Sequence, residues 1–137
     1  MQANEFLNRP FILNNKINDK KIKLDFYREL SCGVPSPSFE EHYSSNRNTK
    51  APFVYYLEKI DELEREIEED YRTLDEIKRE IDKAIDNVED PMEQMILRYR
   101  YLELLSMPDI SVRMHYSLRW TKKLHRRALD SFERGHP

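Results

Sequence analysis

The chain has 137 residues, with 23 Lys and Arg, 26 Asp and Glu, and a formal net charge of −3. Its two glycines cannot build a glycine-rich phosphate or dinucleotide loop, and its one cysteine, Cys32, excludes an intrachain disulfide. Without a cluster of Cys and His we expect no metal, no cofactor and no enzymatic activity.

No apolar run approaches the roughly 18 residues that a transmembrane helix needs. The opening residues, MQANEFLNRPFIL, lack the basic start, apolar centre and cleavage site of a secretory signal. We therefore expect a cytoplasmic protein with no membrane partner.

The charge is divided unevenly along the chain. Residues 58–90 contain 15 acidic and 6 basic residues, a balance of −9, whereas residues 91–137 contain 9 basic and 5 acidic residues, a balance of +4. Six Lys and Arg and no acidic residue lie between Ser111 and Leu129. Such asymmetry predicts a polyanionic partner for the C-terminal end only.

Residues 1–31 are predicted to form the first helix, in which Leu13, Ile17, Leu24, Tyr27 and Leu30 share one stripe. We place Pro10 in the first turn, where a missing N–H donor costs nothing. The stripe is thin at Lys20 and Lys21, so this helix needs a partner helix to be stable.

Residues 32–52 are rich in Pro, Ser and Asn and carry no periodicity, which favours a flexible tether over a functional loop. The next segment, 53–89, has apolar residues every seven positions with a second row between them, the pattern of a helix zipped to another helix. Only Asp70 interrupts the second row, and Tyr71 beside it can cover the gap. The predicted contact residues are Ile60, Leu63, Ile67, Leu74, Ile77 and Ile81.

This acidic helix has two possible partners. It can fold back on the first helix as an antiparallel hairpin, or pair with its copy in a homodimer, and a dimer of hairpins satisfies both. The carboxylates of 62–70 are expected to form a solvated outer face, because acid–base or metal chemistry needs carboxylates that converge from several elements.

Residues 90–137 are predicted to form a separate domain. Asp90 and Pro91 begin its first helix, and Glu93 is placed to complete a capping box with Asp90. Ser106 and Asp109 cap a short helix whose Ile110 and Met114 face inward.

The segment 115–117 then forms a turn, and Ser117 caps a second, basic helix. This helix buries Thr121, Leu124, Ala128 and Phe132 on one face. Two helices joined in this way form a helix-turn-helix. The fold prediction is therefore all-α: a long helical hairpin or coiled coil followed by a helix-turn-helix.

Cationic side chains on the other faces of the basic helix suit the major groove of DNA, where Arg reads guanine edges and Lys or Arg meets phosphates. Near its start, Arg119 and Trp120 are candidates for base contacts, although Trp120 can equally pack on another helix. His125 is a candidate phosphate contact or packing residue. The predicted DNA-binding residues are Ser117, Arg119, Trp120, Lys122, Lys123, Arg126 and Arg127.

The segment 100–129, RYLELLSMPDISVRMHYSLRWTKKLHRRAL, resembles region 4 of sigma-70 class factors. FLNRPFIL, DNVEDPMEQM and LRYRYL extend the resemblance to a family of Gram-positive phage proteins near the ArpU-like late transcriptional regulators. His115 stands where the sigma pattern usually has Gly, so either it adopts a less comfortable backbone conformation or the turn differs in detail.

The resemblance implies a phage-type transcriptional regulator that binds double-stranded promoter or operator DNA and acts either by contacting RNA polymerase or by sigma-like promoter engagement. Two other functions stay open. One is a protein-interaction adapter that binds RNA polymerase or a partner helix. The other is a component of DNA packaging like a small terminase subunit, which would form a ring of many copies.

Overall fold

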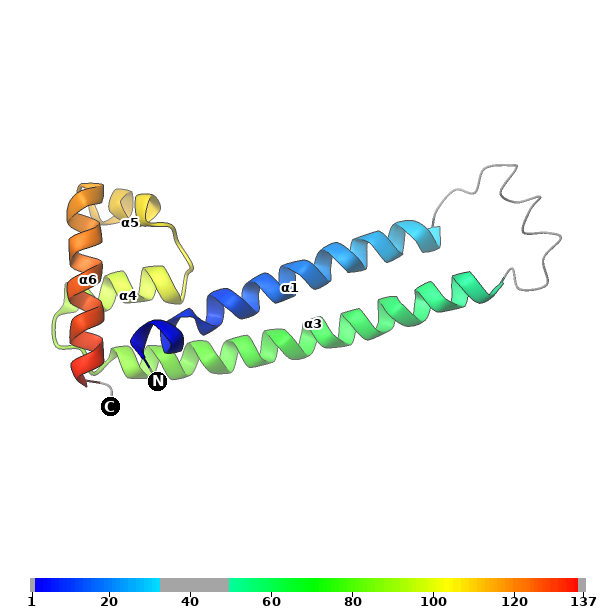
Figure 1. The fold of residues 1–137 in the computed structure, drawn as a ribbon, viewed down its shortest axis with the longest axis horizontal. Helices are drawn as coiled ribbons and strands as arrows, with labels where there is room; N and C mark the ends of the chain where they lie inside the picture. Colours follow the sequence, from blue (N-terminus) through cyan, green and yellow to red (C-terminus); the bar gives the residue numbers. More distant parts are fainter. Residues whose placement is uncertain (1, 33–49, 136–137) are drawn as a thin grey trace. The chain divides into compact units, whose positions relative to one another are not determined.

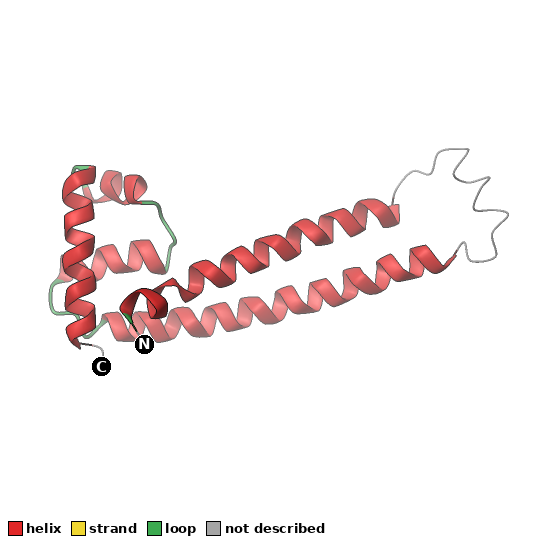
Figure 2. Ribbon diagram, in the orientation of Figure 1, coloured by secondary structure: helices red, strands yellow, loops and turns green. Residues whose placement is uncertain are grey.

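The structure is a computed structural model that describes residues 2–32 and 50–135. Within these residues it contains five helices and no strand, which confirms the all-α prediction (Figures 1 and 2). The helices are α1 (Ala3–Cys32), α3 (Lys50–Ile85), α4 (Pro91–Tyr101), α5 (Met107–Met114) and α6 (Leu118–Gly135). The predicted tether 32–52 falls, except at its two ends, outside the described residues.

The chain divides into two compact units, and both long helices contribute to each. The hairpin unit is Asn15–Arg72, and the core unit combines Met1–Asn14 with Thr73–Pro137. The core unit is thus larger than the segment 90–137 that we expected to form the C-terminal domain. It also takes in the beginning of α1 and the end of α3.

In the hairpin unit, α1 and α3 run antiparallel. Arg28, near the end of α1, forms an ion pair of 3.2 Å with Glu64. The Tyr27 ring lies 6.5 Å from the ring of Tyr55 and 6.0 Å from that of Tyr56, near the start of α3. The long helix therefore pairs with the first helix of the same chain, while pairing between two copies stays a prediction.

The two polar interruptions of the heptad stripes are partners of each other. Lys20 Nζ donates to Asp70 Oδ2 at 2.6 Å, with the two side chains only 29% and 22% exposed. This hydrogen bond, opposed in part by burial, raises the pKa of Lys20. The neighbouring residues also meet, since the Lys21 ammonium lies 5.0 Å from the centre of the Tyr71 ring. A polar pair inside an apolar seam fixes which turns of the two helices lie opposite each other.

The predicted contact stripe of α3 is inward-facing through both units. In the hairpin unit Leu63 and Ile67 are buried and Ile60 is half-buried. In the core unit Leu74 and Ile81 are buried, and Ile77 packs against the hydrophobic core.

The core unit packs the first turns of α1 against the end of α3 and against α4, α5 and α6. The rings of Phe6 and Phe132 lie 5.8 Å apart. The fully buried members of the core are Leu7, Ile81, Ile85, Ile96, Leu97, Ile110, Ala128 and Phe132.

The placement of Pro10 in a first turn is wrong, because α1 begins at Ala3 and Pro10 lies buried inside it. A proline leaves the carbonyl four residues earlier, that of Phe6, without its helical donor. Arg9 Nε donates to this carbonyl at 3.1 Å instead. Figure 1 shows the ribbon of α1 bending after its first turns, as expected for an internal proline.

Replacing Asp70 by Ala should destabilise the hairpin, because it leaves the Lys20 ammonium half-buried without its acceptor. We expect a loss of about 1 kcal/mol in the free energy of unfolding, measured by urea denaturation. The matched control is Glu68→Ala, which removes an exposed ion pair within α3 and should cost less than about 0.5 kcal/mol. Equal losses in the two variants would contradict a special role for the Lys20–Asp70 pair.

Candidate nucleic-acid interface

Helix α6 buries one narrow face. Thr121, Leu124, Ala128 and Phe132 are its buried residues, as the sequence predicts. Thr121 is fully buried, and its hydroxyl donates to the carbonyl of Ser117 at 2.8 Å. The polar group of Thr121 is therefore satisfied, and the inward face stays continuous.

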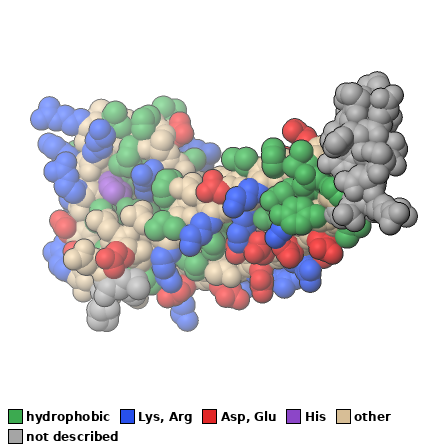
Figure 3. All heavy atoms as spheres, turned by 45° about the vertical axis from the view of Figure 1, so that its right-hand side comes forward, with side chains coloured by type: hydrophobic (Ala, Val, Ile, Leu, Met, Phe, Trp, Pro, Cys, Tyr) green, Lys and Arg blue, Asp and Glu red, His purple; other side chains and the backbone are tan. Residues whose placement is uncertain are grey.

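The cations of α6 lie on its exposed surface. At 100° per residue, Arg119, Lys123 and Arg126 fall opposite the buried face, with Lys122 and Arg127 on either side of them. All five side chains are exposed, and none of them forms an ion pair with another described residue. Figure 3 shows basic side chains gathered over α6, whereas acidic ones follow α3.

Neighbouring cations on the surface of α6 repel one another. Arg119 and Lys123, Lys122 and Arg126, and Lys123 and Arg127 are each four residues apart, so like charges are neighbours on the helix surface. Each such pair costs about 0.2–0.5 kcal/mol of helix stability. The surface therefore gains when an anion lies across it.

The turn that joins α5 to α6 is tightly defined. Ser106 caps α5 by accepting from Asp109 N at 3.3 Å, and Ser117 Oγ accepts from Trp120 N at 3.1 Å, which confirms the two serines as caps. The reciprocal bond expected from the Asp109 carboxylate stays a prediction. Between the helices His115 has φ 59° and ψ 38°, in the left-handed region. Its N–H donates to the Val112 carbonyl at 3.3 Å. The expected uncomfortable conformation of His115 is present.

Of the capping box predicted at α4, the Asp90 cap is confirmed and the role of Glu93 is wrong. Asp90 Oδ1 accepts from Met92 N at 2.9 Å and so caps α4. Glu93, however, is only 5% exposed and accepts a hydrogen bond from Ser131 Oγ near the end of α6. A partner 38 residues away has displaced the local one, and the contact ties α6 to α4.

Trp120 packs on the turn next to it. Its side chain is 40% exposed, and its ring meets the ring of Tyr116 edge-on, with centroids 6.3 Å apart and planes at 84°. Trp120 is not part of the hydrophobic core of the described residues. Its outer surface remains accessible beside Arg119.

His125 faces α4, away from the exposed cations. The Tyr101 hydroxyl lies 2.6 Å from His125 Nε2. Burial, with a smaller contribution from Arg100, lowers the pKa of His125, and burial raises the pKa of Tyr101 to about 12. Both groups are therefore neutral near pH 7. Of the two alternatives for His125, this geometry favours packing over phosphate contact.

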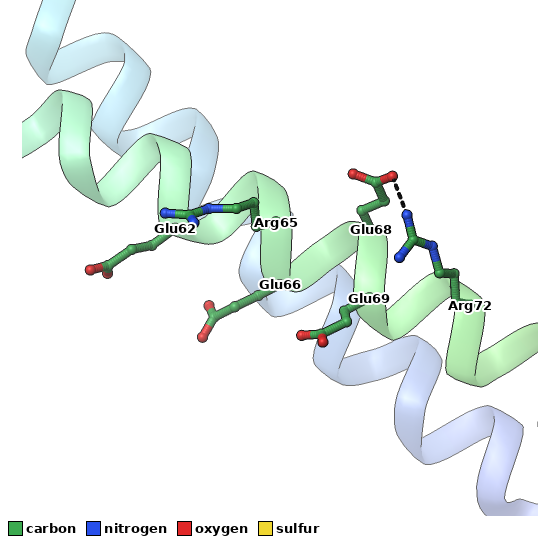
Figure 4. Close-up of a pocket in the computed structure, with 6 residues that line it drawn as sticks. All are labelled: Glu62, Arg65, Glu66, Glu68, Glu69 and Arg72. Carbon is green, nitrogen blue, oxygen red and sulfur yellow. Dashed lines mark hydrogen bonds and ion pairs between the residues drawn. The ribbon is translucent and has the colours of Figure 1, made fainter.

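The acidic run of α3 borders a shallow hollow on one exposed side of the helix (Figure 4). Arg72 donates to Glu68 at 2.8 Å, while Glu62, Glu66 and Glu69 point away from this pair. Within residues 2–32 and 50–135 no three His, Cys, Asp or Glu side chains are placed to hold one metal ion. The glutamates of the run form a solvated face, as predicted, whereas Asp70 at its end lies in the seam with Lys20.

None of the helices described is long and apolar enough to cross a membrane. No protein-family model matches the chain, and neither a curated protein nor a solved structure matches it. The resemblance to sigma region 4 therefore stays an expectation from the quoted motifs.

His115→Gly should stabilise the core unit, because glycine adopts the left-handed conformation without steric cost. We expect a gain of about 1 kcal/mol in the free energy of unfolding. His115→Val should lower it, because a β-branched side chain is worst at positive φ. Urea denaturation of both variants tests this, and a loss of stability in the glycine variant would contradict the role assigned to the turn.

The lowered pKa of His125 predicts a pH dependence of stability. Above its unfolded pKa of 6.5 both states carry a neutral imidazole. As pH falls below this value, the unfolded state gains a proton before the folded state does, so stability falls until the folded pKa is reached. His125→Gln should flatten the stability profile between about pH 7 and pH 5.5, measured by thermal denaturation. Equal slopes in the two proteins would contradict this.

Proposed function

We propose that this protein is a phage-type transcriptional regulator that binds promoter DNA through α5 and α6, which act as a sigma region 4-like helix-turn-helix. The observation that carries the proposal is the exposed face of α6. It presents five cations, none of them in an ion pair with a described residue. It also presents no acid in its first turn.

The dimensions of α6 suit the major groove of DNA. An 18-residue helix is about 27 Å long, and the groove, about 12 Å wide, admits an α-helix. Arg119 projects from the first turn directly away from the core, so we assign it a bidentate contact to a guanine edge. Lys122 and Arg127 lie at the sides of the exposed face and suit the phosphates on either strand.

The rest of the chain supports this role in other ways. The acidic α3 repels DNA, which confines DNA contact to the α6 end. The proposal also includes a homodimer through the long helix, which its heptad pattern allows, and contact with RNA polymerase, which the resemblance implies. Such a regulator acts in the cytoplasm.

DNA binding should weaken steeply as salt rises, because each cation at a phosphate releases a counterion. With the four cations other than Arg119 at phosphates, the slope of log K against log salt should reach about −4. The measurement is fluorescence anisotropy with labelled duplexes from the genomic neighbourhood of the protein. Lack of binding by the intact protein at low salt would overturn the proposal.

Two variants separate base reading from phosphate binding. Arg119→Ala should relax sequence preference, whereas Lys122→Ala should weaken all duplexes alike and reduce the salt slope by about 1. The matched control is Arg72→Ala on α3, which removes another exposed cation, outside the proposed interface, and should leave affinity unchanged. If Arg72→Ala weakened binding as much as Lys122→Ala, net charge would account for the interaction.

A second candidate function is a protein-interaction adapter. The observation that favours it is an apolar hollow in the core unit, where the half-exposed Phe11 and Ile12 lie beside Tyr101 and Leu104. Trp120, the only tryptophan, distinguishes the two functions. Quenching of its fluorescence by duplex DNA supports the regulator, whereas indifference to DNA with a response to RNA polymerase supports the adapter.

A further inference from the structure

The first turn of α6 places a cation between two exposed apolar side chains. Leu118 is 39% exposed and Trp120 is 40% exposed. Neither belongs to the hydrophobic core of the described residues. At 100° per residue they lie on either side of Arg119, which points away from the buried face. Exposed apolar residues are ordinary when they are scattered singly, but these two flank the residue assigned to base contact.

The backbone of this turn and the Trp120 ring each have partners within the chain. The Ser117 hydroxyl caps the N–H of Trp120, and the left-handed His115 sets the path of the turn. The indole ring rests edge-on against Tyr116. Because the backbone of the first turn is capped and its indole ring is packed, binding should cost little conformational entropy.

We propose that this turn reads thymine, through contact of Leu118 and Trp120 with the C5-methyl groups of thymines on either side of the base that Arg119 contacts. The inference rests on the proposed function and deepens it. The thymine methyl is the apolar group that base pairs present in the major groove. An apolar side chain gains nothing from the polar edges of the other bases, so Leu118 and Trp120 favour thymine over cytosine at their positions.

The test removes the methyl group and nothing else. Duplexes that bind tightly are first selected from a random pool, and are then resynthesised with deoxyuridine at single thymine positions. Deoxyuridine keeps the base pairing and the O4 acceptor but lacks the methyl. We expect affinity to fall about fourfold at each contacted position, the effect of leaving one methyl group exposed to water. At all other positions we expect no change.

Variants then connect each methyl to its side chain. Leu118→Ala should weaken the thymine duplex about as much as deoxyuridine does, and should abolish the difference between the two duplexes at one position. Trp120→Ala should abolish it at a second position. The matched control is Val112→Ala, since Val112 is 73% exposed but lies on α5. This control should keep the full preference for thymine. Circular dichroism checks that each variant remains helical.

The possible results distinguish a failure of thymine reading from a failure of DNA binding. Binding to DNA with equal affinity for thymine and deoxyuridine duplexes would overturn thymine reading and leave the regulator intact. A preference for thymine that persists in both Leu118→Ala and Trp120→Ala would also overturn it. Absence of binding to any duplex at low salt would overturn both.

Discussion

The burial of one narrow face of α6 is the constraint on which the candidate interface depends. Thr121, Leu124, Ala128 and Phe132 enter the core at roughly one residue per turn. Once this face is inside, helix geometry leaves every Lys and Arg of the segment 119–127 outside. Thr121 belongs to this face only because its hydroxyl bonds to the carbonyl of Ser117. A buried hydroxyl without that partner would cost more than its methyl group gains.

Features that depend on nearby residues were predictable from the sequence. The caps at Ser106 and Ser117 and the strained turn at His115 each involve groups within a few positions along the chain. Contacts between distant residues were not. In the sequence, Lys20 and Asp70 are separate interruptions of two apolar stripes, and the capping pattern pairs Glu93 with Asp90. Periodicity shows which face a residue occupies, but not which element supplies its neighbour.

The beginning of α1 also depends on contacts with distant residues. By the usual preference, a proline marks the start of a helix, so Pro10 was placed in a first turn. The residues before it instead extend the helix because Phe6 and Leu7 fit the core beside Phe132. Tertiary burial thus outweighed a local rule. For the candidate site, burial separates the inner face of α6 from the outer one. It cannot rank Arg119 above Lys122, because both are exposed and their roles depend on the partner.

Helices α3 and α6 differ in the sign of the charges that lie four residues apart. Three arginines of α3, Arg65, Arg72 and Arg79, each lie 2.8 Å from an acid four residues earlier. This order of charges stabilises a helix, if weakly. On α6 the same spacing joins cation to cation. The proposed DNA partner would relieve this repulsion, because a regular row of phosphates supplies negative charge along the length of the helix.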